Sequence, residues 1–304
     1  MTRSIPLPAG HGGDGPRLAA ALGVPPSSVL DLSMSTNPFA PDVAALAASE
    51  LESLRHYPDP ARATAALAEA IGVGEDRLLL TNGGSQAIAL LAAERPHGRV
   101  DEPEFSLYHH HLAATSVDAP RWRSNPHNPS GRLARADERA DVWDEAFYPL
   151  ATGCWTRADP GAVVVGSLTK LFACPGLRVG YVLADDVDLV ERLRRRQPAW
   201  SVNSLALDLV PRLLARADLG SWARQIAVHR RALATVLAGA GLRPLPSDAN
   251  WLLVEGARGL RERLAPQRVL VRDTTSFGLP GCARVAVPDE AGLQHLAAAL
   301  AATA

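Results

Sequence analysis

The chain has 304 residues, of which 47% are hydrophobic and 21% charged, and its formal net charge is −1. This length can bury a sizeable core, as one large domain or two unequal ones. The near-zero charge gives no reason to expect nucleic acid or an anionic membrane as a partner. No apolar run approaches 18 residues, and the first ten residues lack the apolar region of a signal peptide, so we expect a cytoplasmic protein without membrane contact.

The first two thirds of the chain alternate helical stretches with short apolar β runs. We expect helices over residues 61–72, 85–94 and 185–196, and strands over residues 77–81, 162–167 and 177–184. Short, continuously apolar strands separated by helices are typical of a parallel sheet covered on both faces.

The pattern changes after about residue 198. Two long helices, expected over residues 202–216 and 221–241, lead into short β runs at residues 250–255, 267–272 and 283–288, followed by a closing helix. The sequence therefore predicts a large α/β domain followed by a smaller α+β domain. Ligands of such parallel sheets bind at the carboxyl ends of the strands, so we look for functional residues in the loops there.

Lys170 is the only lysine among the 31 basic residues of the chain, and it lies in the segment GSLTKLFACPGLRVGY. A lysine amine can lose its proton when desolvated and attack a carbonyl group, whereas a guanidinium stays protonated. The alternative is a leftover surface lysine, but the apolar and glycine-rich neighbours favour a reactive amine.

Phosphate-binding features occur on both sides of this lysine. In TNGGSQAI a strand runs into a helix, so that Gly84, Ser85 and the first helical N–H groups are suited to an anion, although an ordinary tight turn has the same pattern. Ser167 and Arg178 flank Lys170 and are suited to a second face of the same phosphate; the alternative for Arg178 is a structural salt bridge.

Three further residues fit an aromatic ring. Asp144, in VWDEAFY, can pair with a protonated pyridine nitrogen or serve as a helix N-cap. Asn128, in the rigid turn NPHNPSG, can hydrogen-bond a phenolic oxygen, and Tyr108 can stack on a ring or belong to the core. A reactive lysine, a phosphate cup, a carboxylate and an amide together indicate pyridoxal 5′-phosphate, held by Lys170 as a Schiff base.

The motifs SLTK followed by Arg178, DEAF, NPHNPSG and ARVAV together resemble the class I/II aminotransferase family of fold-type I pyridoxal-phosphate enzymes. The resemblance covers nearly the whole chain. Within that family, HGGD at residues 11–14, LDLSMSTNP at residues 30–38 and VLVRDTTSFGLPGCARVAVP near the C-terminus are similar to threonine-phosphate decarboxylases of cobalamin biosynthesis. Phe147 stands where aminotransferases often have a tyrosine.

The resemblance implies a division of the chain and a role for each matched residue. It implies an N-terminal arm at residues 1–36 that joins the small domain and the substrate site, a large domain at 37–196 and a small domain at 197–304. Lys170 is then the Schiff-base lysine, Asp144 the partner of the pyridine nitrogen and Asn128 the partner of the ring oxygen. The remaining implied roles are stacking on the ring for Tyr108, phosphate binding for Gly84, Ser85, Ser167 and Arg178, phosphate binding from the neighbouring subunit of a homodimer for Tyr57, and substrate binding for His11, Asn37, Arg272 and Arg284.

The sequence also departs from the family pattern. Ser35 stands where the family usually has an asparagine near the substrate. The stretches from Tyr108 to Asn125 and from Gly131 to Asp144 look shorter than the family norm, so we expect trimmed elements in the large domain.

Three functions are compatible with these features. The first is decarboxylation of a phosphorylated amino acid, threonine phosphate, to aminopropanol phosphate. The second is an aminotransferase of the histidinol-phosphate type. The third, a non-catalytic pyridoxal-phosphate sensor, fits poorly, because we expect no DNA-binding domain and the set of catalytic residues is complete. We expect no metal site, because consecutive histidines at residues 109–111 diverge on a helix and the three cysteines form no CxxC pair.

Overall fold

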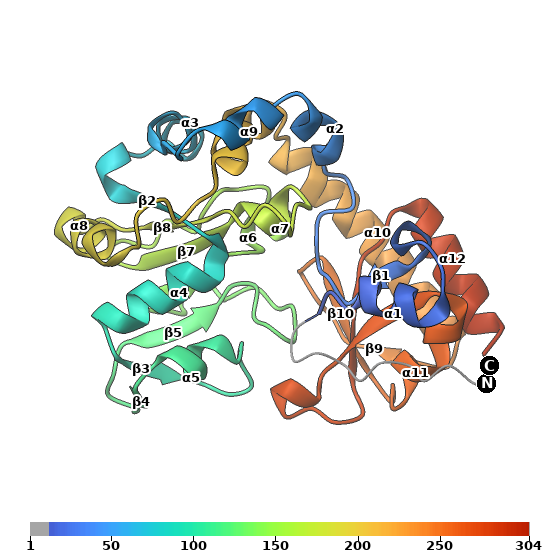
Figure 1. Ribbon diagram of the computed structural model, residues 1–304. Helices are drawn as coiled ribbons and strands as arrows, with labels where there is room; N and C mark the ends of the chain where they lie inside the picture. The colour runs from blue at the N-terminus through green and yellow to red at the C-terminus, as the bar shows by residue number, and fades with distance from the viewer. Residues whose placement is uncertain (1–11, 304) are drawn as a thin grey trace.

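A computed structural model describes residues 12–303. Its larger sheet has seven strands in the order β2-β8-β7-β6-β5-β3-β4 (Figure 1). In chain order these are β2 (Leu78–Thr81), β3 (His97–Val100), β4 (Ala114–Thr115), β5 (Arg121–Ser124), β6 (Val142–Asp144), β7 (Val163–Ser167) and β8 (Gly180–Leu183). The neighbours from β7 to β4 pair in parallel.

Helices cover both faces of this sheet. Leu78 and Leu80 of β2 pack in one core, while Leu79 packs in the core on the opposite face, because successive side chains of a strand point to opposite sides. The helices of the first face are α3 (Ala61–Ile71), α6 (Tyr148–Thr152), α7 (Leu168–Leu171) and α9 (Ser204–Leu214). Those of the second face are α4 (Gly83–Glu94), α5 (Leu107–His111) and α8 (Val187–Arg196). The prediction of a mostly parallel sheet buried on both faces is confirmed.

Strand β8 is the exception to the parallel arrangement, since it pairs antiparallel with both β2 and β7. The connection from β7 to β8 contains only the one-turn helix α7 and a short loop. A parallel return needs a longer crossover, so the chain reverses direction instead. This reversal places Lys170 and Arg178 at the same end of the sheet.

The second sheet has five strands in the order β1-β11-β12-β10-β9. Its strands are β1 (Leu30–Leu32), β9 (Arg243–Pro244), β10 (Trp251–Glu255), β11 (Val269–Asp273) and β12 (Ala283–Ala286), and its helices include α11 (Leu260–Leu264) and α12 (Glu290–Ala301). The N-terminal strand β1 pairs in parallel with β11, so the segment after α1 (Gly15–Leu22) belongs to this sheet. Helix α2 (Val43–Ala48) and 3₁₀ turns at Pro26–Ser28, Leu51–Arg55, Glu75–Arg77, Ala265–Gln267 and Thr275–Phe277 complete the elements.

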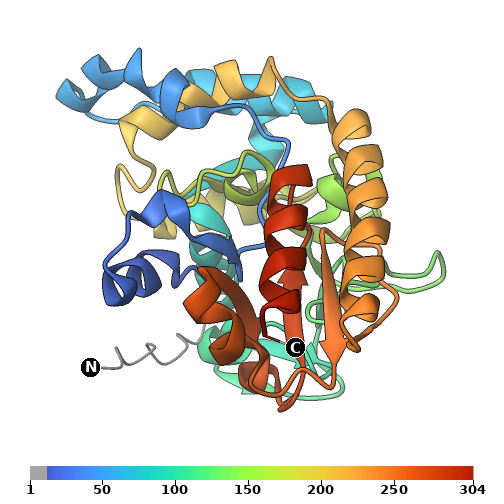
Figure 2. The same cartoon turned by 90° about the vertical axis from the view of Figure 1, so that its right-hand side faces the viewer.

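Helix α10 (Leu219–Gly239) connects the two cores. Trp222 and Ile226 pack with the larger sheet, whereas Leu233 and Leu237 pack with the smaller one. Figure 2 shows this helix running alongside α12. Helix α9 also packs with the larger sheet.

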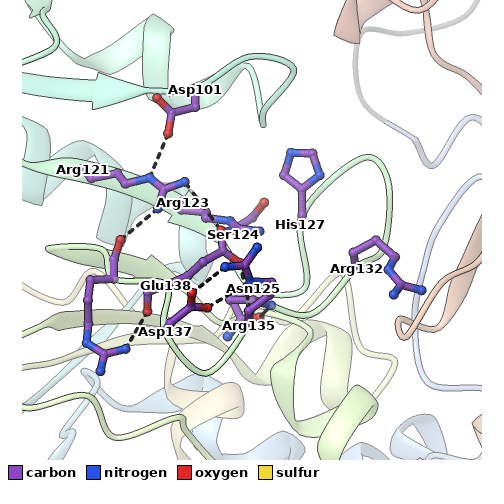
Figure 3. A network of polar contacts seen from close by, with 12 residues as sticks. Asp101, Arg121, Arg123, Ser124, Asn125, His127, Arg132, Arg135, Asp137 and Glu138 are labelled. Atoms are coloured by element: carbon purple, nitrogen blue, oxygen red, sulfur yellow. Dashed lines mark hydrogen bonds and ion pairs between the residues drawn. The ribbon is translucent and has the colours of Figure 1, made fainter.

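The connection between β5 and β6 contains no helix, although these strands are parallel. The expected shortening between Gly131 and Asp144 therefore corresponds to a loop, residues 125–141, where a crossover helix is usual. Polar contacts from Arg121 and Arg123 hold this loop against the sheet (Figure 3). The loop starts with the residues that line the candidate site.

Candidate active site

A cavity of about 560 Å³ lies at the carboxyl ends of the larger sheet and reaches the second sheet. Residues from both parts of the chain line it. Those predicted from the sequence are Gly84, Ser85, Asn128, Asp144, Ser167, Lys170, Arg178, Arg272 and Arg284. The structure thus brings nine of the predicted residues around one cavity.

Lys170 lies on α7, directly after the carboxyl end of β7, and its Nζ is 5.9 Å from the centre of the Phe147 ring. Burial, together with the charges of Arg284, Arg178 and Arg272, lowers the pKa of its amine to about 8. An amine with such a pKa is partly neutral near physiological pH, which is the form that attacks a carbonyl group.

The predicted phosphate cup forms where α4 begins. Gly83 has a φ of +72°, and a Cβ added there would lie 2.6 Å from Nη2 of Arg178, so the guanidinium lies directly against this turn. A Cβ on Gly180 would lie 2.6 Å from the backbone of Gly83 and Gly84, so β8 approaches the turn closely only because it has no side chain here. Arg178 itself has a φ of +57°, which is uncommon for a residue other than glycine and is typical of functional sites.

Asp144 ends β6, and its carboxylate faces the cavity. It accepts hydrogen bonds from the Ala146 amide at 3.1 Å and from the Tyr108 hydroxyl at 2.9 Å. Burial raises its pKa, and these two hydrogen bonds oppose that rise. A buried carboxylate in this position would gain from a cationic partner such as a protonated ring nitrogen. It does not cap a helix, since α6 begins after Phe147.

Tyr108 does not line the cavity, which differs from its expected stacking role. Its ring is buried against Phe105 and Trp122, and its hydroxyl contacts Asp144, because α5 begins at Leu107 and turns Tyr108 inward. The ring that does line the cavity from this segment is Phe105, three residues earlier. The sequence signal for this position is the aromatic residue of PEF, three residues before Tyr108.

Asn128 and Arg284 form a buried pair. The Oδ1 atom of Asn128 accepts a hydrogen bond of 2.6 Å from Nη1 of Arg284, which leaves the amide nitrogen of Asn128 as the donor for a ligand. The guanidinium of Arg284 lies 4.9 Å from the centre of the Trp251 ring. Among the described residues its Nε has no hydrogen-bond partner. Burial lowers the pKa of Arg284 well below its usual value, so this cation would be stabilised by an anion.

Arg272 faces Arg284 across the β11–β12 pair. Both side chains are buried and line the cavity. Burial lowers the pKa of Arg272 to about 10, while Asp273 and Asp14 oppose this change. Two guanidinium groups at one cavity wall fit a ligand with more than one negative charge.

Asn37 and Ser35 are buried beside the site but do not line the cavity. The Asn37 amide donates to the Leu171 carbonyl at 3.0 Å, and its backbone N–H donates to the Lys170 carbonyl. Asn37 therefore holds the chain against the helix of Lys170, and the expected substrate contact is not seen.

Two predicted residues lie elsewhere. Tyr57 is 78% exposed, packs against Trp200 and does not line the cavity of its own chain. His11 lies outside the described residues. Gly12, Gly13 and Met34 also line the cavity; they lie in the HGGD and LDLSMSTNP motifs, but no role was assigned to them. Leu107 and Ser124 line it outside any motif, although Ser124 directly precedes NPHNPSG.

The profile of the aminotransferase class I and II family matches residues 122–300. The chain belongs to this family. It is also 30% identical to threonine-phosphate decarboxylase of Salmonella typhimurium, with 95% of each chain covered. It is 29% identical to histidinol-phosphate aminotransferase 1 of Dechloromonas aromatica, with 90% of this chain and 89% of that protein covered.

Solved structures of the family show the same fold. Histidinol-phosphate aminotransferase from Sinorhizobium meliloti in complex with pyridoxal-5′-phosphate has a TM-score of 0.80 at 18% identity, covering 100% of this chain and 98% of that one. L-threonine-O-3-phosphate decarboxylase from Porphyromonas gingivalis has a TM-score of 0.72 at 23% identity, covering 88% and 98%. The predicted fold type is therefore confirmed.

Family members of this class depend on pyridoxal phosphate, and the cofactor prediction is confirmed at that level. The cavity also fits the group chemically, with a glycine turn and arginine for its phosphate, a buried acid for its ring nitrogen and one lysine with a lowered pKa. Within residues 12–303 no helix is long and apolar enough to cross a membrane, and no group of three potential ligands is arranged around a metal ion.

Proposed function

We propose that this enzyme decarboxylates L-threonine O-3-phosphate to aminopropanol phosphate, a step of cobalamin biosynthesis. The observation that supports this proposal is the pair of buried arginines, Arg272 and Arg284, which line the cavity from the paired strands β11 and β12. The proposed substrate has a carboxylate and a phosphate on one small molecule, so each guanidinium has an anion to bind.

The other candidate is an aminotransferase of the histidinol-phosphate type. Histidinol phosphate has a phosphate but no carboxylate, so one of the two arginines would serve only the amino-group acceptor. The decarboxylase and the aminotransferase relatives have nearly the same sequence identity to this chain, so identity does not distinguish the two functions. The pair of arginines is therefore the argument for decarboxylation.

The cofactor, when bound, supplies an electron sink for the bond that breaks at the substrate Cα. The side chains of this protein supply the rest. Lys170, with a pKa of about 8, can hold or release a proton at Nζ near neutral pH. Asp144 places a negative charge at the ring nitrogen, and Asn128 offers an amide hydrogen to the ring oxygen. Arg178, Ser167 and Ser85 hold the cofactor phosphate.

The two arginines and Asn128 then orient the substrate. Arg284 is fixed between the Trp251 ring and Asn128, so its direction is set before a ligand arrives. We assign the carboxylate to Arg284 and the substrate phosphate to Arg272, with His11 as a further phosphate contact.

The proposed assembly is a homodimer with shared sites. Tyr57 and Trp200 form an exposed aromatic pair, with ring centres 4.6 Å apart, near exposed Leu51 and Leu54. An exposed apolar group of this kind favours a protein partner. In a dimer, Tyr57 of one subunit would reach the cofactor phosphate of the other.

The decisive experiment is product analysis with threonine phosphate. We expect release of carbon dioxide and formation of aminopropanol phosphate without an amino acceptor. Formation of a keto acid only when a 2-oxo acid is added, together with transamination of histidinol phosphate, would replace this proposal with the second candidate.

A further inference from the structure

Behind the cavity wall lies Glu104, a buried acid in the loop between β3 and α5. Its Oε1 accepts a hydrogen bond of 2.9 Å from the Ser124 amide, and its Oε2 lies 2.6 Å from the Ser124 hydroxyl. The Phe105 amide also donates to Oε2, at 3.1 Å. Glu104 therefore has its main contacts with a residue that lines the cavity.

Ser124 connects Glu104 to both residues that we assign to the cofactor ring. Its hydroxyl accepts a 2.7 Å hydrogen bond from the backbone N–H of Asn128 and also makes a hydrogen bond with the Tyr108 hydroxyl. Tyr108 in turn donates to Oδ2 of Asp144 at 2.9 Å. The pairing of strands β5 and β6 also brings these residues together, since Ser124 lies opposite Asp144 in the ladder.

We propose that Glu104 is a positioning residue that holds the proton of a buried acid pair, so that Asp144 stays ionised and oriented to pair with the ring nitrogen that the cofactor would present. This inference rests on the site assignment in the proposed function but not on the identity of the reaction.

Charge and hydrogen-bond geometry both support this proton distribution. Two buried carboxylates that are coupled electrostatically do not readily ionise together, and the charge of Asp144 contributes to the rise in the pKa of Glu104. Burial is the main cause of that rise, which reaches about 8. When Glu104 is protonated it can donate to the Ser124 hydroxyl. The single proton of that hydroxyl is then available to Tyr108, which continues the chain of donors to Asp144.

The other charged groups around Glu104 are few. His127 Nε2 is 4.0 Å from Oε1 of Glu104, but burial lowers the pKa of this histidine and its Nε2 contacts the Pro103 carbonyl. Arg123 is coupled to Glu104 through its charge, and its guanidinium contacts Glu138. Glu102 interacts with the backbone amide of Glu104. Among the described residues Glu104 forms no ion pair with a lysine or arginine. Burial therefore dominates its raised pKa, the hydrogen bonds from Ser124 and Phe105 oppose the rise, and the charge of Asp144 adds a smaller contribution in the direction of burial.

The test compares Glu104→Gln, Glu104→Ala and the matched control Glu145→Gln. Glu145 is also a buried acid, adjacent to Asp144, but it binds the Arg157 amide on the other side. The measurements are the dissociation constant of pyridoxal 5′-phosphate from the apoprotein and the visible circular dichroism of the bound cofactor, on both sides of pH 8.

We expect Glu104→Ala to weaken cofactor binding about tenfold and to change the circular dichroism, because buried donors lose their acceptor. In the unsubstituted protein, binding and dichroism should change above about pH 8, as Glu104 ionises. Glu104→Gln, a neutral analogue of the protonated acid, should keep neutral-pH binding and lose the part of this change that Glu104 causes. Only the part due to Lys170, whose pKa is also about 8, should remain. Glu145→Gln should behave as the unsubstituted protein.

If Glu104→Gln retains the full change above pH 8 and Glu104→Ala binds as well as Glu145→Gln, the inference is wrong. Should Glu104→Ala fail to fold, Ser124→Ala tests the same connection and should weaken cofactor binding similarly; unchanged binding would again overturn the inference.

Asp144→Asn distinguishes failure of the site assignment from failure of the inference about Glu104. If its dichroism is unchanged, the site assignment fails together with the inference. If only the Glu104 and Ser124 variants are without effect, the inference alone fails.

Discussion

At the scale of single residues, the site places three arginines near the amine of Lys170 and thereby lowers its pKa. Arg284, Arg178 and Arg272 all act on Lys170, and burial acts in the same direction. The same arginines need anions, since two of them are buried with lowered pKa values. Anionic cofactor and substrate groups would therefore stabilise the arginines while the lysine supplies the reactive amine.

We expect Lys170→Arg to remove the visible absorption band of the bound cofactor while leaving the fold intact. A guanidinium cannot form the covalent link, and no second lysine exists to replace it. The check is the absorption spectrum together with the protein mass after borohydride reduction. A reducible band in this variant would contradict the assignment.

We expect Arg272→Ala to reduce kcat/KM for threonine phosphate by about 10- to 150-fold, the effect of losing a charged hydrogen bond of about 1.5–3 kcal/mol. The spectral response of the bound cofactor to alanine, which has no phosphate, should change much less. Arg243→Ala, at an exposed arginine of the same sheet, is the control. Equal losses with both amino acids would mean that Arg272 does not bind the phosphate.

The stability of the apoprotein should depend on Glu145. Burial raises its pKa from 4.5 to about 7, so between these values the folded protein holds a proton that the unfolded chain releases. Stability from this group is therefore complete below pH 4.5 and is lost as the pH rises to about 7, by at most about 3 kcal/mol. Urea unfolding of Glu145→Gln should show a flatter pH dependence in this window, and an unchanged slope would refute the assignment.

At the scale of elements, arginine contacts replace a crossover helix between β5 and β6. The guanidinium of Arg157 donates to the carbonyls of residues 134, 135, 136 and 138 and lies 5.0 Å from the Trp143 ring. Arg121 donates to the Arg139 carbonyl, and Arg123 contacts Glu138 (Figure 3). These contacts satisfy loop carbonyls that would bond internally in a helix, and they cover a buried tryptophan.

We expect Arg157→Ala to lower the free energy of unfolding by about 2–4 kcal/mol, because several loop carbonyls and the Trp143 ring lose one partner. Arg157→Lys should restore little, since an ammonium cannot reach the carbonyls with a planar fork. Chemical denaturation and limited proteolysis of residues 133–141 measure the effect. Arg139→Ala serves as control, as its side-chain contacts are exposed, and an equal loss there would argue against a special role of Arg157.

At the scale of the whole molecule, the site is assembled from segments far apart in the chain. Gly13 lies near one end and Arg284 near the other, and both line the cavity with residues of the larger sheet. The parallel pairing of β1 with β11 brings the N-terminal segment to this place. A site that lies between two packed sheets depends on their relative position. The hydrogen bond between Asn128, which follows β5, and Arg284 on β12 links the two sides of the cavity.

The shared-site proposal predicts complementation between subunits. A mixture of Lys170→Ala and Tyr57→Ala chains should form dimers in which one site has both an intact lysine and a Tyr57 from the partner. Cofactor retention should then recover in part, although neither variant alone retains cofactor normally. Light scattering checks the dimer, and absence of recovery in mixed dimers would show that Tyr57 does not act across the interface.

Much of the candidate site could be predicted from sequence because its chemistry depends on residue type. Few kinds of site combine a single lysine, a glycine turn before a helix and an aspartate at a strand end. The structure places these residues around one cavity. The apolar runs likewise predicted β2, β7 and β8 and the two-sided burial of the larger sheet, since continuity of apolar residues is a local property.

Only the tertiary structure decided which side of an element faces the cavity. Phe105 and Tyr108 are three residues apart, and the point at which α5 begins determines that one lines the cavity and the other binds Asp144. The role of Asn37 and the direction of β8 depend on chain packing in the same way. Glu104 has no motif, because its relation to Asp144 exists only through Ser124 and Tyr108. The chemistry of a residue follows from its type and can be read from the sequence, whereas these orientations result from contacts between segments that are distant in the chain.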